Sequence, residues 1–220
     1  MSKSFVLVLA LTLLASISSA QSIAGIRIGE PASVLDKLNL QPTARAHMGS
    51  MDTVKYKLVN GNELSVTYES PAGRIVYLEC DWNGNPESVA TDFPAFKFGI
   101  TTLEKIRLAN GSNGFSYKSN AMNAANGELF TFNDYSIEDK PGLVAVFVTS
   151  LNIAELRKRR DNKEPGADDV AKNLTLEAVI LAQETYLDEI WGKDKISDPE
   201  AKPIRWGAID TTAENPRANS

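Results

Sequence analysis

Residues 53–69 read TVKYKLVNGNELSVTYE and decide the fold class, because two alternating runs flank one turn. In each run apolar side chains alternate with polar ones, which is the period of a β-strand with one buried face. The turn Asn60-Gly61-Asn62 is typical of a β-hairpin. The apolar set is Val54, Tyr56, Leu58, Leu64, Val66 and Tyr68. This stretch therefore predicts an antiparallel hairpin that covers a core with one face.

The segments on either side of the hairpin form a pattern that recurs once along the chain. Ile26–Gly29 (IRIG) matches Phe96–Gly99 (FKFG), at an offset of 70 residues, and a short helical pattern follows each. Gly73 and Gly142 each open a further apolar strand. Repetition of this kind indicates a duplicated unit. The sequence predicts an α+β fold of two tandem helix-plus-antiparallel-meander units, at residues 21–92 and 93–152.

The C-terminal third is predicted to be helical and then extended. Asp168–Trp191 carries apolar residues at helical spacing, so a long helix is expected to pack on the sheet. Residues 153–192 thus form a basic loop, with the run Arg157-Lys158-Arg159-Arg160, and this C-terminal helix. The last segment, 193–220, is predicted to be an extended, partly disordered tail. Its apolar cluster 204–206 is expected to anchor it, and 211–220 to be disordered.

Residues 1–20 are predicted to be a cleavable signal peptide. Lys3 precedes the apolar run FVLVLALTLLA, and Ser18-Ser19-Ala20 places small residues at the cleavage site. The apolar run is too short to span a bilayer, so a retained anchor is disfavoured. No cysteine follows the cleavage site to accept a lipid. A periplasmic or secreted protein that does not span the membrane is expected.

Composition excludes several classes of function. The net charge is −5, and an acidic chain lacks the basic surface that nucleic acid requires. Cys80 is the one cysteine and is expected to be buried; with His47 as the one histidine, zinc and nucleophilic sites are disfavoured. His47 lies in a polar stretch that is predicted to be a loop. No catalytic residue, metal site or cofactor is predicted.

The order of short strand, helix, hairpin and Gly-led strand resembles the unit of the small outer-membrane assembly lipoproteins of the SmpA/OmlA type. Its duplication is similar to the β-lactamase-inhibitor-protein-like fold. The residues that carry the resemblance are Ile26–Gly29, Asn60-Gly61, Gly73–Leu78, Phe96–Gly99 and Gly142–Phe147. The chain lacks the lipidated cysteine of the first family and the disulfides of the second. The resemblance implies a binding scaffold, but a shared fold does not transfer a function.

One face of the first meander is the candidate binding surface. Tyr77, Glu79 and Asp81 occupy alternate positions of one predicted strand, and Lys55 and Lys57 lie on the polar face of another. A mixed aromatic and charged face is suited to docking a protein. Glu79 and Asp81 also have the spacing of a general acid/base pair, which any exposed strand shares.

Three functions remain open on the sequence. The leading prediction is a non-enzymatic envelope protein that binds another envelope or extracellular protein, as an inhibitor or assembly factor does. The second is a secreted hydrolase that acts on cell-wall sugars through carboxylates. The third is a carrier with a cavity for a small ligand. A deep cleft with carboxylates would favour the enzyme, a closed apolar cavity the carrier, and a shallow sheet with exposed Tyr77 the binder.

Overall fold

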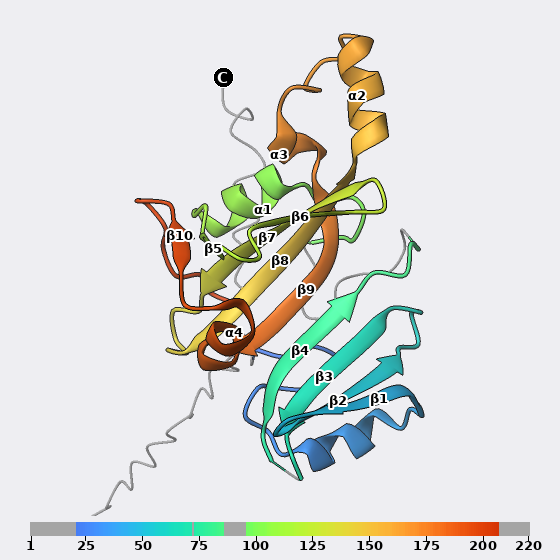
Figure 1. Ribbon diagram of the computed structural model, residues 1–220, viewed down its shortest axis with the longest axis vertical. Coiled ribbons are helices and arrows are strands. Elements are labelled where there is room, and N and C mark those ends of the chain that lie inside the picture. Colours follow the sequence, from blue (N-terminus) through green and yellow to red (C-terminus); the bar gives the residue numbers. More distant parts are fainter. Residues whose placement is uncertain (1–20, 72, 86–95, 207–220) are drawn as a thin grey trace, which may run out of the picture.

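The structure, a computed structural model, describes residues 21–71, 73–85 and 96–206, and one large antiparallel sheet organises it (Figure 1). The described strands follow the order β1-β2-β3-β4-β9-β8-β7-β5-β10, and β6 pairs with β7 beside this row. The strands are β1 Pro42–Met48, β2 Met51–Lys57, β3 Glu63–Glu69, β4 Ile75–Asp81, β5 Phe115–Tyr117, β6 Met122–Ala125, β7 Glu128–Ser136, β8 Leu143–Asn152, β9 Thr175–Gln183 and β10 Lys195–Ser197. The helices are the 3-10 helix η1 Ala32–Leu38 and the α-helices α1 Leu103–Asn110, α2 Ile153–Asp161, α3 Val170–Asn173 and α4 Glu184–Trp191. The predicted α+β class is confirmed.

The hairpin predicted from residues 53–69 is present as β2 and β3. The two strands pair from Met51 opposite Glu69 to Lys57 opposite Glu63. Gly61 lies in the connecting turn with φ of +89°, a conformation that glycine adopts without strain. The Asn60 side-chain oxygen accepts a hydrogen bond from the Asn62 backbone N–H and closes the turn.

The pairing of β4 with β9 joins the two halves of the sheet. Asp81 lies opposite Ala178 and Tyr77 opposite Ala182, so strands distant in sequence are neighbours at the centre. The segment before each first helix binds the start of one of these strands. The Gly29 N–H donates to the Ile75 carbonyl, and the Gly99 N–H donates to the Leu176 carbonyl, each at 2.8 Å.

The prediction of one long helix over Asp168–Trp191 is wrong. The segment divides into the short α3, the nine-residue strand β9 and the two-turn α4, which ends at Gly192. In β9 apolar side chains lie on both faces of the strand. Ile180 belongs to one core, and its neighbour Leu181, which points to the opposite face, belongs to the other. A strand covered on both faces reads as a continuous apolar run, which periodicity cannot distinguish from a buried helix.

The main core lies on one face of the sheet. Directly opposite residues of antiparallel strands point to the same face, so the register aligns this core across the sheet. Helices η1 and α1 cover it with Val34, Leu35 and Ile106. The strands contribute Val54, Tyr56, Leu64, Val66, Leu78, Cys80, Val179, Leu181, Ala145, Phe147 and Tyr135. Cys80 is buried as predicted.

A second core lies on the opposite face and covers only part of it. Leu187 of α4 packs there against Val144, Val146, Ala178 and Ile180. In Figure 1, α4 lies over the lower ends of β8 and β9, whereas no helix lies over β2 and β3 on that side. The described part of the sheet thus has one face that is covered over its central strands and one face that is covered over only about half of them.

The remaining segments correct or confirm smaller predictions. The stretch around His47, predicted as a loop, is the exposed edge strand β1. The basic run Arg157–Arg160 ends α2, a helix that projects from one end of the sheet (Figure 1). The boundary predicted at residue 152 separates β8 from β9, which are adjacent in the sheet. Ile204 and Trp206 are buried and anchor the tail, as predicted. The predicted signal peptide and the segment 211–220 lie outside the described residues.

Candidate functional site

The register places all five predicted binding residues on the half-covered face, with Tyr77 beneath the part that α4 covers. Lys55 lies opposite Ser65, and Ser65 lies opposite Glu79. In the next row Lys57 lies opposite Glu63, which lies opposite Asp81. These two rows are called the acidic face, and the Tyr77 row lies beside them. Its members from the sequence prediction are Lys55, Lys57, Glu79 and Asp81.

Charges on the acidic face are not balanced. Lys55 forms an ion pair with Glu63, with 2.5 Å between Nζ and Oε1. Neither Glu79 nor Asp81 forms an ion pair with any residue that the structure describes. Glu177, on the neighbouring strand β9, adds a further carboxyl whose nearest side-chain partner is the Ser150 hydroxyl, at 3.4 Å. The face thus holds more carboxylates than cations.

Partial burial and neighbouring carboxylates perturb Glu79 and Asp81, and a hydrogen bond from Tyr77 opposes the effect at Glu79. Burial raises the pKa of Glu79 to about 7, and the charge of Asp81 contributes to the rise. Burial also raises the pKa of Asp81 to about 6, against the opposing charge of Lys55. The hydrogen bond to Glu63 raises the pKa of Lys55. Glu79 and Asp81 therefore change protonation state near neutral pH, where exposed carboxyls with ordinary pKa values stay ionised.

Tyr77 does not lie exposed on this face, as the binding hypothesis expected. Its ring packs edge-to-face against Tyr186 of α4, with 5.7 Å between the ring centroids. Burial raises the pKa of the Tyr77 hydroxyl well above its ordinary value. The physical reason is that α4 returns over the sheet after β9, which the prediction of one long helix did not allow. Tyr77 thus forms the border between the acidic face and the second core.

Two hollows of the described residues lie away from Glu79 and Asp81, one beside β1 and one beside α1. Within the described ranges, no group of three or more His, Cys, Asp or Glu residues is placed to hold a metal ion. Carboxylates that hydrolyse glycosidic bonds act from both sides of a bound sugar, which a sheet surface does not enclose.

His47 takes part in a surface contact that does not form a catalytic triad. Its Nδ1 lies 2.8 Å from the Asp52 carboxylate beside a hollow of about 330 Å³. Hydrogen bonds from His47 and Ser70 lower the pKa of Asp52. Asp52 therefore lies between the histidine and the serine, whereas nucleophilic catalysis requires the histidine beside the hydroxyl.

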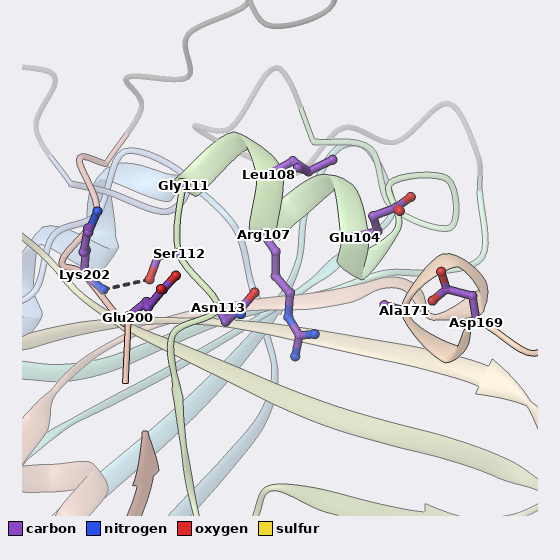
Figure 2. Close-up of a pocket in the computed structure, with 10 residues that line it drawn as sticks. All are labelled: Glu104, Arg107, Leu108, Gly111, Ser112, Asn113, Asp169, Ala171, Glu200 and Lys202. Atoms are coloured by element: carbon purple, nitrogen blue, oxygen red, sulfur yellow. Dashed lines mark hydrogen bonds between the residues drawn. The ribbon is translucent and has the colours of Figure 1, made fainter. Parts of the chain in front are cut away.

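A second candidate site, which the sequence analysis missed, is a groove of about 440 Å³ along α1 (Figure 2). The Arg107 guanidinium points into its centre, between the short α3 on one side and the chain at 200–202 on the other. The residues that line it are Glu104, Arg107, Leu108, Gly111, Ser112, Asn113, Asp169, Ala171, Glu200 and Lys202. The only sequence signal was a charged residue one position after the buried Ile106, which many surface helices share.

Comparison of the chain with protein-family models, curated proteins and solved structures finds no match. The resemblance to duplicated inhibitor and assembly-lipoprotein folds therefore remains an expectation. None of the helices that the structure describes is long and apolar enough to cross a bilayer. Function must be inferred from the two sites themselves.

Proposed function

We propose that the protein is an exported, non-enzymatic scaffold that binds a basic segment of another envelope or extracellular protein on its acidic face. The proposal includes a duplicated α+β unit, with η1 and β1–β4 in the first copy. The second copy, predicted at residues 93–152, is extended to β9, so that β4 corresponds to β9 rather than to the Gly142-led β8. The matching hydrogen bonds of Gly29 to β4 and Gly99 to β9 support that duplication. Export rests on the signal-like residues 1–20 and leaves the periplasm and the medium as compartments.

The observation that carries the proposal is that neither Glu79 nor Asp81 forms an ion pair with a described residue. Both carboxyls are partly buried, Glu79 is hydrogen-bonded by Tyr77, and the Lys55 ammonium is engaged by Glu63. Burial of carboxylates without counter-charges is unfavourable, and a cation brought to them recovers much of that free energy. A partner that supplies Lys or Arg would therefore bind where the isolated protein is least satisfied.

Binding of a cation should release protons from the same carboxyls. A partner's guanidinium or ammonium favours the ionised forms and lowers both pKa values. The affinity should therefore rise as the pH increases from about 5.5 to about 8, where the carboxylates no longer need to lose protons on binding. A hydrophobic contact on the same face would show no such dependence.

Affinity capture with matched variants tests the proposal. The bait is the chain from Gln21, and its double variant Glu79→Gln/Asp81→Asn keeps the side-chain shapes but removes the charges. The control, Asp36→Asn/Glu155→Gln, removes two exposed carboxylates that lie in η1 and α2. We expect the wild type and the control to retain a common partner from envelope extract at pH 7.5, and the double variant to lose it. Equal retention by all three baits would exclude the acidic face.

The carrier hypothesis has one supporting observation, the groove along α1. The groove is open and has several charged residues in its lining, whereas the carrier hypothesis expected a closed apolar cavity. Its chemistry indicates a different ligand class, which is developed below.

A further inference from the structure

The groove along α1 contains an arginine that forms no direct ion pair with a described residue. A hydrogen bond from Asn113 and, more weakly, the charge of Arg107 lower the pKa of the Asp198 carboxyl. Arg107 Nη2 makes one long hydrogen bond, of 3.4 Å, to the Asn133 side-chain oxygen. Its Nε is buried and has no acceptor. Among the described residues no carboxylate lies within ion-pair distance of this guanidinium. Because a guanidinium offers five N–H donors and remains charged, Arg107 is strongly under-satisfied.

A buried hydroxyl, that of Ser112, lies on the wall of the same groove. Ser112 is 7% exposed, and its Oγ accepts hydrogen bonds from the backbone N–H groups of Gly114, at 3.2 Å, and Lys202, at 2.9 Å. Both contacts use the oxygen as acceptor, so the hydroxyl hydrogen remains to be donated. Figure 2 shows the Ser112 bond to Lys202 on the wall of the groove. Ser112 is thus a further donor on the groove wall, and Asn113 lies between it and the Arg107 guanidinium (Figure 2).

The walls of the groove are acidic on both sides. On one side Glu104 and Asp169 share the ammonium of Lys172, at 3.5 Å and 3.0 Å. On the other side Glu200 lies next to Ser112 and forms no ion pair with the described part of the chain. A simple anion would meet the attraction of Arg107 but also the repulsion of these carboxylates. A ligand that also carries a positive group would satisfy both Arg107 and Glu200.

We propose that this groove binds a small zwitterion of the amino-acid class. The ligand's carboxylate accepts hydrogen bonds from the terminal nitrogens of Arg107, and its ammonium faces Glu200. A volume of about 440 Å³ lies within the usual range for small-molecule sites. Leu108 lies exposed at the rim of the groove and offers an apolar contact for a side chain of the ligand. This site is separate from the acidic face and does not depend on the function proposed for it.

Chemical-shift mapping of the ¹⁵N-labelled chain from Gln21 tests the proposal. Each standard L-amino acid is titrated, and the strongest binder is compared with its deaminated acid and its decarboxylated amine. We expect saturable shifts of the amides of residues 111–114 with one or more amino acids, and at least about tenfold weaker binding of both analogues. No saturable shift with any amino acid would overturn the proposal. An acid analogue that binds as tightly as its amino acid would reduce the groove to a plain anion site and would also overturn it.

Variants separate ligand binding from folding. Arg107→Gln and Glu200→Gln should each weaken the amino acid about tenfold or more, since each removes one charge-assisted contact. Lys105→Gln, which removes an exposed cation from the same helix, should leave the affinity unchanged. Thermal unfolding of each variant confirms that it folds. If Arg107→Gln unfolds, Glu200→Gln provides the test, and unchanged affinity in a folded Glu200→Gln would refute the zwitterion.

Discussion

Asp134 is the most unusual ionisable group of the described structure, and Asp134→Asn should stabilise the protein in a pH-dependent way. The residue lies in β7 opposite Val146, on the apolar face that α4 covers, and it is 0% exposed. Neither carboxylate oxygen has a hydrogen-bond partner of good geometry. Burial raises the pKa of Asp134 to about 7, although the Tyr117 backbone and the charge of Lys195 oppose the rise. The folded protein therefore prefers the protonated acid.

The sign of the effect follows from the two states. The unfolded chain ionises near the ordinary value of 3.8, whereas the folded protein holds the proton until about pH 7. The native state consequently loses stability as the pH rises between these values, up to a limit of about 4 kcal/mol. Asparagine has nearly the same shape and cannot ionise. The stability gained by Asp134→Asn should therefore be about 2.5 kcal/mol larger at pH 8 than at pH 5.

Urea unfolding of both proteins at pH 5 and pH 8, followed by tryptophan fluorescence, measures this difference. The comparison between the two proteins cancels the pH dependence of every other group. Asp139→Asn, which changes an exposed carboxylate shortly after β7, serves as the control and should show the same small effect at both pH values. A free-energy difference for Asp134→Asn that is equal at the two pH values would refute the reasoning, because the buried carboxyl would then ionise normally.

Three further predictions test the packing and the acidic face. Gly99→Ala should destabilise by more than about 2 kcal/mol in urea, because its φ is +67° and a Cβ would lie 2.3 Å from the Trp82 ring. Ile180→Ala should cost about 2–5 kcal/mol in the same assay, since the side chain is fully buried in β9; a loss below 1 kcal/mol would contradict the central placement of that strand. Lys55→Met should raise the pKa of Asp81 in an NMR titration of the carboxyl carbons, because Lys55 opposes the shift of that group; an unchanged or lower pKa would argue against their interaction.

Local signals in the sequence were enough to predict the first meander. Alternation and the Asn60-Gly61 turn fix the register of β2 and β3, and the register in turn places Lys55, Glu79 and Asp81 on one face. Candidate binding residues on a single hairpin and its neighbour are therefore accessible to sequence reasoning. Whether that face is open depends on elements far along the chain.

The errors arose where distant pairing decides the structure. Residues 175–183 form a strand because β4 and β8 offer hydrogen bonds on both sides, and nothing in the segment itself records those partners. Once they were read as helix, the position of α4 and the covering of Tyr77 could not be predicted. The groove at Arg107 was missed for a related reason, since its walls come from three segments that meet only in the folded chain.

The central β4–β9 pair has a consequence for the order in which the protein can assemble. Asp81 pairs with Ala178, 97 residues later, so a chain that ends at residue 174 lacks the strand that fills the middle of the sheet. Such a chain presents two long open edges, β4 and β8, whose unpaired backbone groups invite association with other chains. Pairing over this sequence distance is also slow, because a large loop must close first. Nascent or truncated chains should consequently aggregate readily, and a chaperone that shields β4 until β9 arrives would protect them.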